Sequence, residues 1–156
     1  MTLHELLALF TSKNIEYTTA HLDAVDQNAQ LTDVASDSRE VTPGSLFVCK
    51  GTHFSPAYLA SAVEAGAVAY LCQQTLAEEL QAVAPNVAAI CVDDVRLAMA
   101  YAAAGVAGHP DKKLTTIGIT GTKGKSTCSY MLRAILDGDE PYSKCGVIGG
   151  IEVFDG

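Results

Sequence analysis

The sequence predicts an α/β fold: a small N-terminal domain built on a mixed or parallel sheet, followed by the beginning of a second domain. Apolar runs of strand length alternate with helical patterns between residues 55 and 106, as in parallel strands joined by right-handed crossovers. Hydrophobic residues make up 49% of the chain, enough to bury a sheet between helices. A glycine-rich turn over residues 120–127 then separates another apolar run from another helical pattern.

Local patterning and start or stop signals predict each element. Leucines at helical spacing predict the first helix, and Asn14 ends it. Ser55 caps the second helix, Pro56 starts it and Gly66 ends it. Asp93 is the predicted cap of the fourth helix. In chain order the predicted elements are a helix over 3–10, a loop over 15–30, strands over 31–36 and 46–49, a helix over 55–64, a strand over 67–72, a helix over 75–83, a strand over 87–92, a helix over 95–106, a strand over 114–119, a helix over 128–136, a strand within 142–148 and an edge strand over 151–154.

A polar, proline-containing segment over residues 108–113 follows a helix stop and predicts a hinge. We therefore expect a first domain over residues 1–110 and a second over residues 111–156. A sheet entered through a glycine-rich turn of this kind needs several more strands after the turn, and residues 127–156 are too few to supply them. The chain is accordingly predicted to be the N-terminal part of a longer protein.

Composition and charge exclude several classes of protein. The formal net charge of −8 is opposite to the basic footprint that nucleic acid binding requires. No apolar run approaches the roughly 18 residues that cross a bilayer, and Glu5 interrupts an N-terminal run without a basic lead, so neither a membrane span nor a signal peptide is expected. Five scattered cysteines without a C-x-x-C pair predict reduced, mostly buried thiols of a cytoplasmic protein and no zinc site.

The glycine-rich turn has the parts of a phosphate-binding loop. Its glycines let backbone N–H groups approach an anion at a helix N-terminus, Lys125 reaches the outer phosphates, and Ser126 is placed to ligate a phosphate-bound Mg²⁺. Ile119 stands where the general pattern has a glycine, so this loop is a shorter variant, and the alternative is an ordinary turn with a solvent-facing lysine. The second domain is therefore predicted to be the beginning of a P-loop domain. The predicted phosphate-binding residues are Gly121, Thr122, Lys123, Gly124, Lys125, Ser126 and Thr127.

A second polar cluster, Asp37-Ser38-Arg39, is predicted at a strand end ahead of a turn, where binding residues are often mounted. Arginine grips anions in a bidentate fork, serine donates to a phosphate or a base carbonyl, and aspartate orients the arginine. The alternative is an exposed ion pair that stabilises the turn. His53, in the loop after a short strand, is either a residue that stacks on a nucleotide base or an exposed loop histidine.

Taken together, these motifs resemble the Mur ligase family. The resemblance rests on Asp37-Ser38-Arg39 with residues 41–48, on residues 62–69 and on residues 120–127, and it extends over residues 31–136. It implies a three-domain enzyme whose N-terminal domain holds a uridine nucleotide and whose central domain binds ATP. The resemblance also implies roles for single residues: Ser38 contacts the UDP-sugar, Lys125 is catalytic because it neutralises phosphate charge, and Ser126 ligates Mg²⁺.

The activity implied by the resemblance is ATP-dependent amide formation in peptidoglycan synthesis. The sequence is most like members that add the third amino acid to UDP-N-acetylmuramoyl-L-alanyl-D-glutamate through an acyl phosphate, because a carboxylate must be activated before an amine can displace its oxygen. Lys123 and the short segment over residues 49–55 favour L-lysine over meso-diaminopimelate. The chain alone is expected to be an inactive monomer. A member that adds D-alanyl-D-alanine, disfavoured by residues 47–58, and a non-catalytic nucleotide-binding module remain as alternatives.

Overall fold

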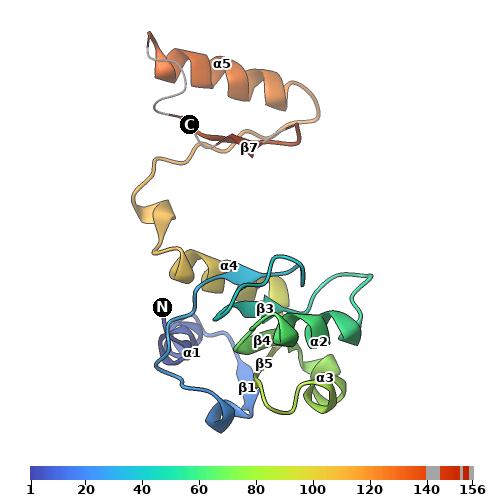
Figure 1. The fold of residues 1–156 in the computed structure, drawn as a ribbon. Helices are drawn as coiled ribbons and strands as arrows, with labels where there is room; N and C mark the ends of the chain where they lie inside the picture. The colour runs from blue at the N-terminus through green and yellow to red at the C-terminus, as the bar shows by residue number, and fades with distance from the viewer. Residues whose placement is uncertain (140–144, 152, 155–156) are drawn as a thin grey trace. The chain divides into compact units, whose positions relative to one another are not determined.

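The computed structural model describes residues 1–139, 145–151 and 153–154. By its internal contacts the chain divides into two compact units, Met1–Leu114 and Thr115–Gly156 (Figure 1). The first unit is a sheet covered by helices on both faces, and the second is a helix that packs on a small hairpin. The predicted α/β class with a mixed sheet is confirmed.

The sheet of the first unit has five strands in the order β1-β5-β4-β3-β2. Neighbouring strands from β2 to β5 run parallel, and β1 runs antiparallel to β5, so the sheet is mixed. The central register sets Leu71 beside Ile90 and Cys72 beside Cys91. The strands are β1 Tyr17–Ala20, β2 Val34–Ala35, β3 Leu46–Val48, β4 Ala69–Gln73 and β5 Ala88–Val92.

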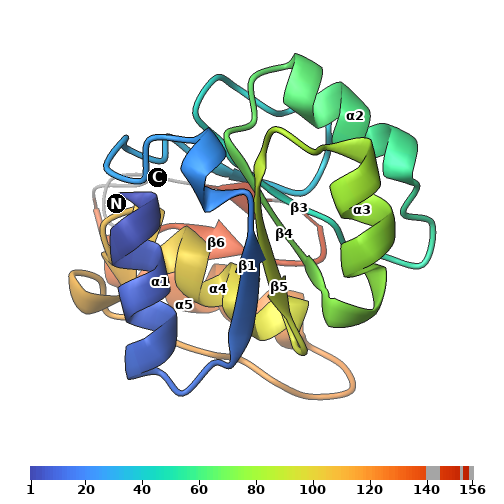
Figure 2. The same cartoon turned by 90° about the horizontal axis from the view of Figure 1, so that it is seen from below.

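Helices cover both faces of this sheet, α1 and α4 on one side and α2 and α3 on the other (Figure 2). Leu6 and Leu59 are fully buried, one in each of the two cores. Because successive strand residues point to opposite faces, β5 sends Ile90 into the first core and Cys91 into the second. The helices are α1 Leu3–Ser12, α2 Pro56–Glu64, α3 Ala77–Val83 and α4 Val95–Val106, with 3₁₀ turns at Leu22–Ala24, Gln74–Leu76 and Pro110–Lys112.

The C-terminus of α2 and the N-terminus of α4 test the predicted helix boundaries. Gly66 follows α2, so the predicted glycine stop is confirmed. A glycine is needed there because φ is +104° and because a Cβ would lie 2.9 Å from the Pro43 Cα. The predicted cap of α4 is wrong by one residue. Asp94, not Asp93, is the N-cap, and its Oδ1 accepts hydrogen bonds from two backbone N–H groups of the first turn, each at 3.0 Å. Adjacent aspartates satisfy the same local rule, and the helix start at Val95 selects between them.

The stretch over residues 15–30, predicted as a loop, contains strand β1. This edge strand pairs with β5 from Tyr17 to Ala20, and the Tyr17 ring meets Phe10 edge-on with centroids 6.2 Å apart. Its two central residues, Thr18 and Thr19, are exposed. Alternation is therefore too weak in the sequence to predict the strand, and the long-range pairing with β5 decides it.

The second unit contains helix α5 Lys125–Asp137, which begins three residues before its predicted start, and strands β6 Val147–Ile148 and β7 Val153–Phe154 in antiparallel pairing. The strands predicted within 142–148 and 151–154 are confirmed in part by β6 and β7, whereas residues 142–144 lie outside the described residues. The strand predicted over 114–119 is wrong. No described strand pairs with this segment, and Leu114 and Ile117 are 65% and 57% exposed. Within the described ranges no helix has the length and apolar character of a membrane span.

Candidate functional site

The predicted substrate residues Asp37, Ser38, Arg39 and His53 line one cavity of ≈ 680 Å³ in the first unit. The first three follow β2 and His53 follows β3, so two neighbouring parallel strands deliver them at their carboxyl ends. Open α/β sheets bind ligands at this edge. The cavity is also lined by Ser36, Phe47, Lys50, Gly51, Thr52, Phe54, Tyr58 and Ser61.

The carboxylate of Asp37 holds the guanidinium of Arg39. Arg39 Nε donates to Asp37 Oδ1 at 2.9 Å, Nη2 donates to Oδ2, and the Arg39 backbone N–H donates to Oδ1 at 3.0 Å. These hydrogen bonds lower the pKa of Asp37 from 3.8 to about 2 and raise the pKa of Arg39. Because the Arg39 side chain is 87% exposed, its outer N–H groups face solvent in an orientation that Asp37 sets. The cavity therefore presents an oriented cation.

Sequence reasoning missed the other residues of this cavity, among them Lys50, Phe54 and Tyr58. The rings of Phe54 and Tyr58 meet edge to face, with centroids 6.4 Å apart and planes at 72°. Tyr58 is 49% exposed, so its ring offers an apolar wall to a flat group beside His53. The available signal was a lysine and two aromatic residues gathered around His53, within residues 50–58.

A second cavity, of ≈ 560 Å³, shares Lys50, Gly51 and Thr52 with the first. Asp94 and Arg96, at the N-terminus of α4 beyond β5, also line it. Its lining holds two cations, Lys50 and Arg96, and two carboxylates, Asp93 and Asp94, of which Asp94 caps α4. The two cavities together carry Arg39, Lys50 and Arg96 along the carboxyl edge of the sheet. The cation that lies apart from these two carboxylates is Arg39, in the first cavity.

The predicted phosphate-binding residues lie at the N-terminus of α5 in the second unit. Gly124 is the N-cap, with φ +79° and no side-chain hydrogen bond to the first turn, so the first backbone N–H groups of the helix are open to an anion. Lys125 Nζ donates to the carbonyl of Gly121 at 2.7 Å, which lays the side chain back over the loop. An ammonium has three N–H donors, so two remain for a ligand. The backbone and the lysine therefore fit a triphosphate.

The other predicted residues of the loop are accessible. Thr122, Lys123 and Thr127 are exposed, and Ser126 is half-buried in the first turn of α5. The Ser126 hydroxyl is an oxygen ligand of the kind that Mg²⁺ takes. In the part of the chain that the structure describes, no group of three or more His, Cys, Asp or Glu residues could hold a metal ion. Cys128, one of the five cysteines predicted to be mostly buried, is exposed.

Comparison with known proteins relates the chain to a group of bacterial ligases. It is 41% identical over 111 residues to the UDP-N-acetylmuramyl-tripeptide synthetase of Latilactobacillus sakei, a match that covers 71% of this chain and 20% of the relative. It is 38% identical over 127 residues to the UDP-N-acetylmuramoyl-L-alanyl-D-glutamate--2,6-diaminopimelate ligase of Caldanaerobacter subterraneus, covering 80% of this chain and 25% of that protein. The chain thus spans a fifth to a quarter of the length of these relatives. No protein-family model matches it.

Solved structures share the fold. MurF from Acinetobacter baumannii superposes with a TM-score of 0.60 at 23% identity, covering 85% of this chain and 27% of that one. At this identity the likeness concerns the fold alone, a mostly parallel five-stranded sheet with helices on both faces. The chain is thus similar in sequence to the N-terminal portion of Mur ligases, and it shares the fold of a solved Mur ligase structure.

Proposed function

We propose that this chain is the N-terminal part of an ATP-dependent ligase of peptidoglycan synthesis that adds the third amino acid, L-lysine in preference to meso-diaminopimelate, to UDP-N-acetylmuramoyl-L-alanyl-D-glutamate. The observation that carries the proposal is the cavity that gathers Asp37, Ser38, Arg39 and His53 at the ends of β2 and β3. The names of the relatives support the addition of a third amino acid, whereas the preference for L-lysine rests on Lys123 and residues 49–55. The protein works as a monomer in the cytoplasm, with residues 1–110 as the substrate domain and residues 111–156 as the start of the ATPase domain.

Each wall of the cavity suits one part of a nucleotide sugar. Arg39, oriented by Asp37, binds a phosphate oxygen, and the Ser38 hydroxyl donates to the same ligand. His53 and the exposed ring of Tyr58 form a surface on which uracil stacks. The protein does not need a large basic surface for this ligand, because single cations placed in a hollow bind a diphosphate locally.

The loop ahead of α5 holds the second substrate, ATP. When bound, Mg·ATP supplies the phosphoryl group that converts the D-glutamyl carboxylate to an acyl phosphate, which an amine can attack. The backbone N–H groups behind Gly124 bind the phosphates, Lys125 neutralises their negative charge and Ser126 ligates the Mg²⁺. Thr122, Lys123 and Thr127 complete the rim of the loop.

A binding titration tests the substrate cavity. Calorimetry with UDP-N-acetylmuramoyl-L-alanyl-D-glutamate should give a one-to-one complex, and Arg39→Ala should weaken it about tenfold to a hundredfold, the usual effect of losing a hydrogen bond to a charged group. Ser38→Ala should weaken it less. Lys112→Ala, in the 3₁₀ turn Pro110–Lys112, removes a cation that lines neither cavity and is the matched control. If the Arg39→Ala variant and the unmodified chain bound the ligand with equal affinity, this cavity would not be the substrate site.

The second candidate is the ligase that adds D-alanyl-D-alanine, because a solved structure named as a D-alanyl-D-alanyl ligase shares this fold. An addition assay on the full-length protein separates the two. Lysine and meso-diaminopimelate are offered with the UDP-dipeptide, and D-alanyl-D-alanine is offered with the UDP-tripeptide. Incorporation of lysine with the first acceptor is expected. Incorporation only of D-alanyl-D-alanine would establish the second candidate, and ATP binding without any incorporation would favour a non-catalytic nucleotide-binding module.

A further inference from the structure

Three cysteine side chains form a row across the sheet of the first unit. Cys49 follows β3, Cys72 lies in β4 and Cys91 lies in β5, and all three belong to the core beneath α2 and α3. Cys72 and Cys91 are direct partners in the parallel register, and their Sγ atoms are 3.5 Å apart. All three thiols are free and buried. Cys72 and Cys91 line neither the substrate cavity nor the second cavity beside it.

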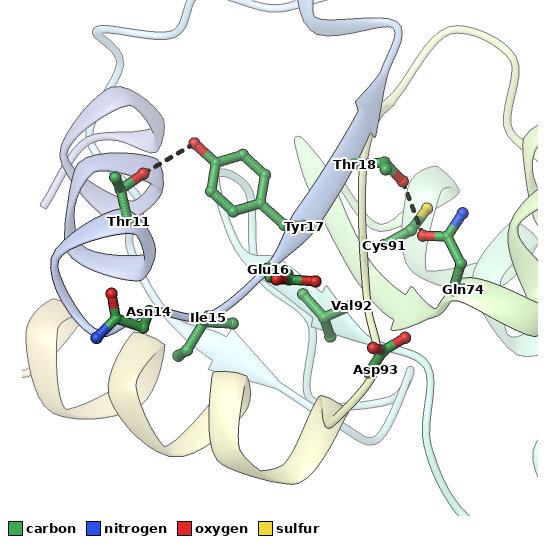
Figure 3. Close-up of a pocket in the computed structure, with 10 residues that line it drawn as sticks. All are labelled: Thr11, Asn14, Ile15, Glu16, Tyr17, Thr18, Gln74, Cys91, Val92 and Asp93. Atoms are coloured by element: carbon green, nitrogen blue, oxygen red, sulfur yellow. Dashed lines mark hydrogen bonds between the residues drawn. The ribbon is translucent and has the colours of Figure 1, made fainter.

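One member of the row borders a cavity. A cavity of ≈ 690 Å³ between α1, β1 and the end of β5 is lined in part by Cys91, whose exposed fraction is 1% (Figure 3). Thr18 donates a hydrogen bond to Gln74 Oε1 at 2.8 Å beside the Cys91 sulfur. Glu16 and Asp93 line the same cavity. Of the two thiols in contact, Cys91 is therefore the one that borders this cavity, and Cys72 does not line it.

The hydrogen bond between the two thiols makes them unequal. Cys72 donates its S–H to Cys91, which lowers the pKa of Cys91 and raises the pKa of Cys72. Burial raises the pKa of Cys49. The thiolate is the nucleophile in thiol oxidation, so Cys91 is the sulfur that reacts with an oxidant first. Cys72, which is in contact with Cys91, is then placed to attack the oxidised Cys91 sulfur.

We propose that Cys72 and Cys91 are a peroxide-reactive pair that closes to a disulfide between β4 and β5. Adjacent strands lie about 4.8 Å apart, within the roughly 4.4–6.8 Å between Cα atoms that disulfides span. The sulfur atoms must approach from 3.5 Å to about 2 Å, which side-chain rotation supplies without moving the strands.

The chemistry balances with hydrogen peroxide as the oxidant. The Cys91 thiolate attacks one peroxide oxygen, the O–O bond breaks, and the released oxygen takes up protons as water, leaving a sulfenic acid on Cys91. The Cys72 sulfur then displaces the sulfenic hydroxyl, which leaves as a second water with the Cys72 proton. The two thiols lose two hydrogen atoms, and one peroxide is reduced to two waters.

The sequence offers a direct assay. Trypsin cuts after Lys50 and Arg96 and nowhere between them, so residues 51–96 form one peptide that contains Cys72 and Cys91 and no other cysteine. The folded protein is treated with hydrogen peroxide, its remaining thiols are alkylated, and it is digested with trypsin. The masses of the peptides are then measured by mass spectrometry. The peptide should be two hydrogen atoms lighter and resist alkylation. Further cleavage after Glu79 should leave its halves joined until dithiothreitol is added.

Variants make the result specific. Cys49→Ser removes a buried thiol of the same row and should leave the disulfide unchanged. Cys72→Ser should stop at a Cys91 sulfenic acid that dimedone traps. The proposal is overturned if peptide 51–96 of the folded, unmodified protein keeps both thiols under conditions that oxidise the exposed Cys128, or if Cys91 is over-oxidised without forming the disulfide. Both of these outcomes are measured on the unmodified protein, so the test remains decisive even if a variant does not fold.

Discussion

The two units of this chain differ in what they bury. The first unit encloses two apolar cores, and residues such as Leu6, Leu59 and Ile90 have no exposed surface. In the second unit Met131, Ile135 and other large apolar side chains are more than half exposed, whereas the buried residues of α5 are Arg133 and Asp137. The first unit therefore has the apolar burial that stabilises a domain, whereas α5 and the hairpin β6–β7 have little.

The N-termini of α4 and α5 also differ. The first N–H groups of α4 are bonded to the Asp94 carboxylate, whereas α5 starts at Gly124 without a side-chain cap. A capped terminus stabilises its own helix, and an uncapped one is available to an anion. The N-terminus of α4 is thus satisfied internally, and that of α5 stays open.

The largest effect is expected from a matched pair of isoleucines. Ile90→Ala removes a side chain with no exposed surface from the first unit and should lower the free energy of unfolding by about 2–5 kcal/mol. Ile135→Ala changes a side chain that is 75% exposed in α5 and should alter it by less than about 0.5 kcal/mol. Urea unfolding followed by circular dichroism measures both. Similar losses would mean that the second unit has a core of its own.

A smaller effect is expected at the start of α4. Asp94→Ala removes the two capping hydrogen bonds and should cost about 1 kcal/mol. Asp93→Ala changes the neighbouring carboxylate, which does not cap the helix, and serves as the control. The same unfolding measurement separates them. If Asp93→Ala were the more costly variant, the cap inferred from sequence would be right and the structure wrong at this helix.

The smallest effect concerns the ion pair of the substrate cavity. The folded-state pKa of Asp37, about 2, is below its ordinary 3.8, so the pair adds stability that is fully present above 3.8 and is lost as pH falls towards 2. The gain is slight because the pair is exposed to solvent. NMR titration of the Asp37 carboxyl should show a midpoint that rises towards 3.8 in Arg39→Ala, where the backbone N–H of position 39 still donates to the carboxylate, and that stays low in Glu40→Gln. A midpoint unmoved by Arg39→Ala would mean that another group holds the pKa of Asp37 down.

The elements with strong local signals were predictable. The Gly66 stop, the buried runs of β4 and β5, and the helix after the glycine-rich turn all follow from residue type and spacing. Strand β1 was not predictable, because its threonines are exposed and its pairing with β5 joins residues far apart in sequence. The prediction for the apolar segment over 114–119 had the opposite error, a strand predicted where none forms. A β-branched run forms a strand only where another strand can pair with it, and no described strand pairs with this segment.

The candidate site divides in the same way. The motif residues Ser38, Arg39 and His53 were visible as residue types in suggestive places, but Phe54 and Tyr58 acquire meaning only when β2 and β3 bring their loops to one cavity. The Cys72–Cys91 contact was equally hidden, because the spacing of the two cysteines says nothing about the register of β4 and β5.

By itself the amino-acid sequence determined the α/β class, most helix and strand positions, and the two motifs, because each depends on side-chain chemistry and on spacing within a few residues. Only the tertiary structure decided which strand forms the sheet edge, which aspartate caps α4, which side chains share a cavity and which thiols touch. These outcomes depend on contacts between distant segments, and those contacts exist only after the chain has folded.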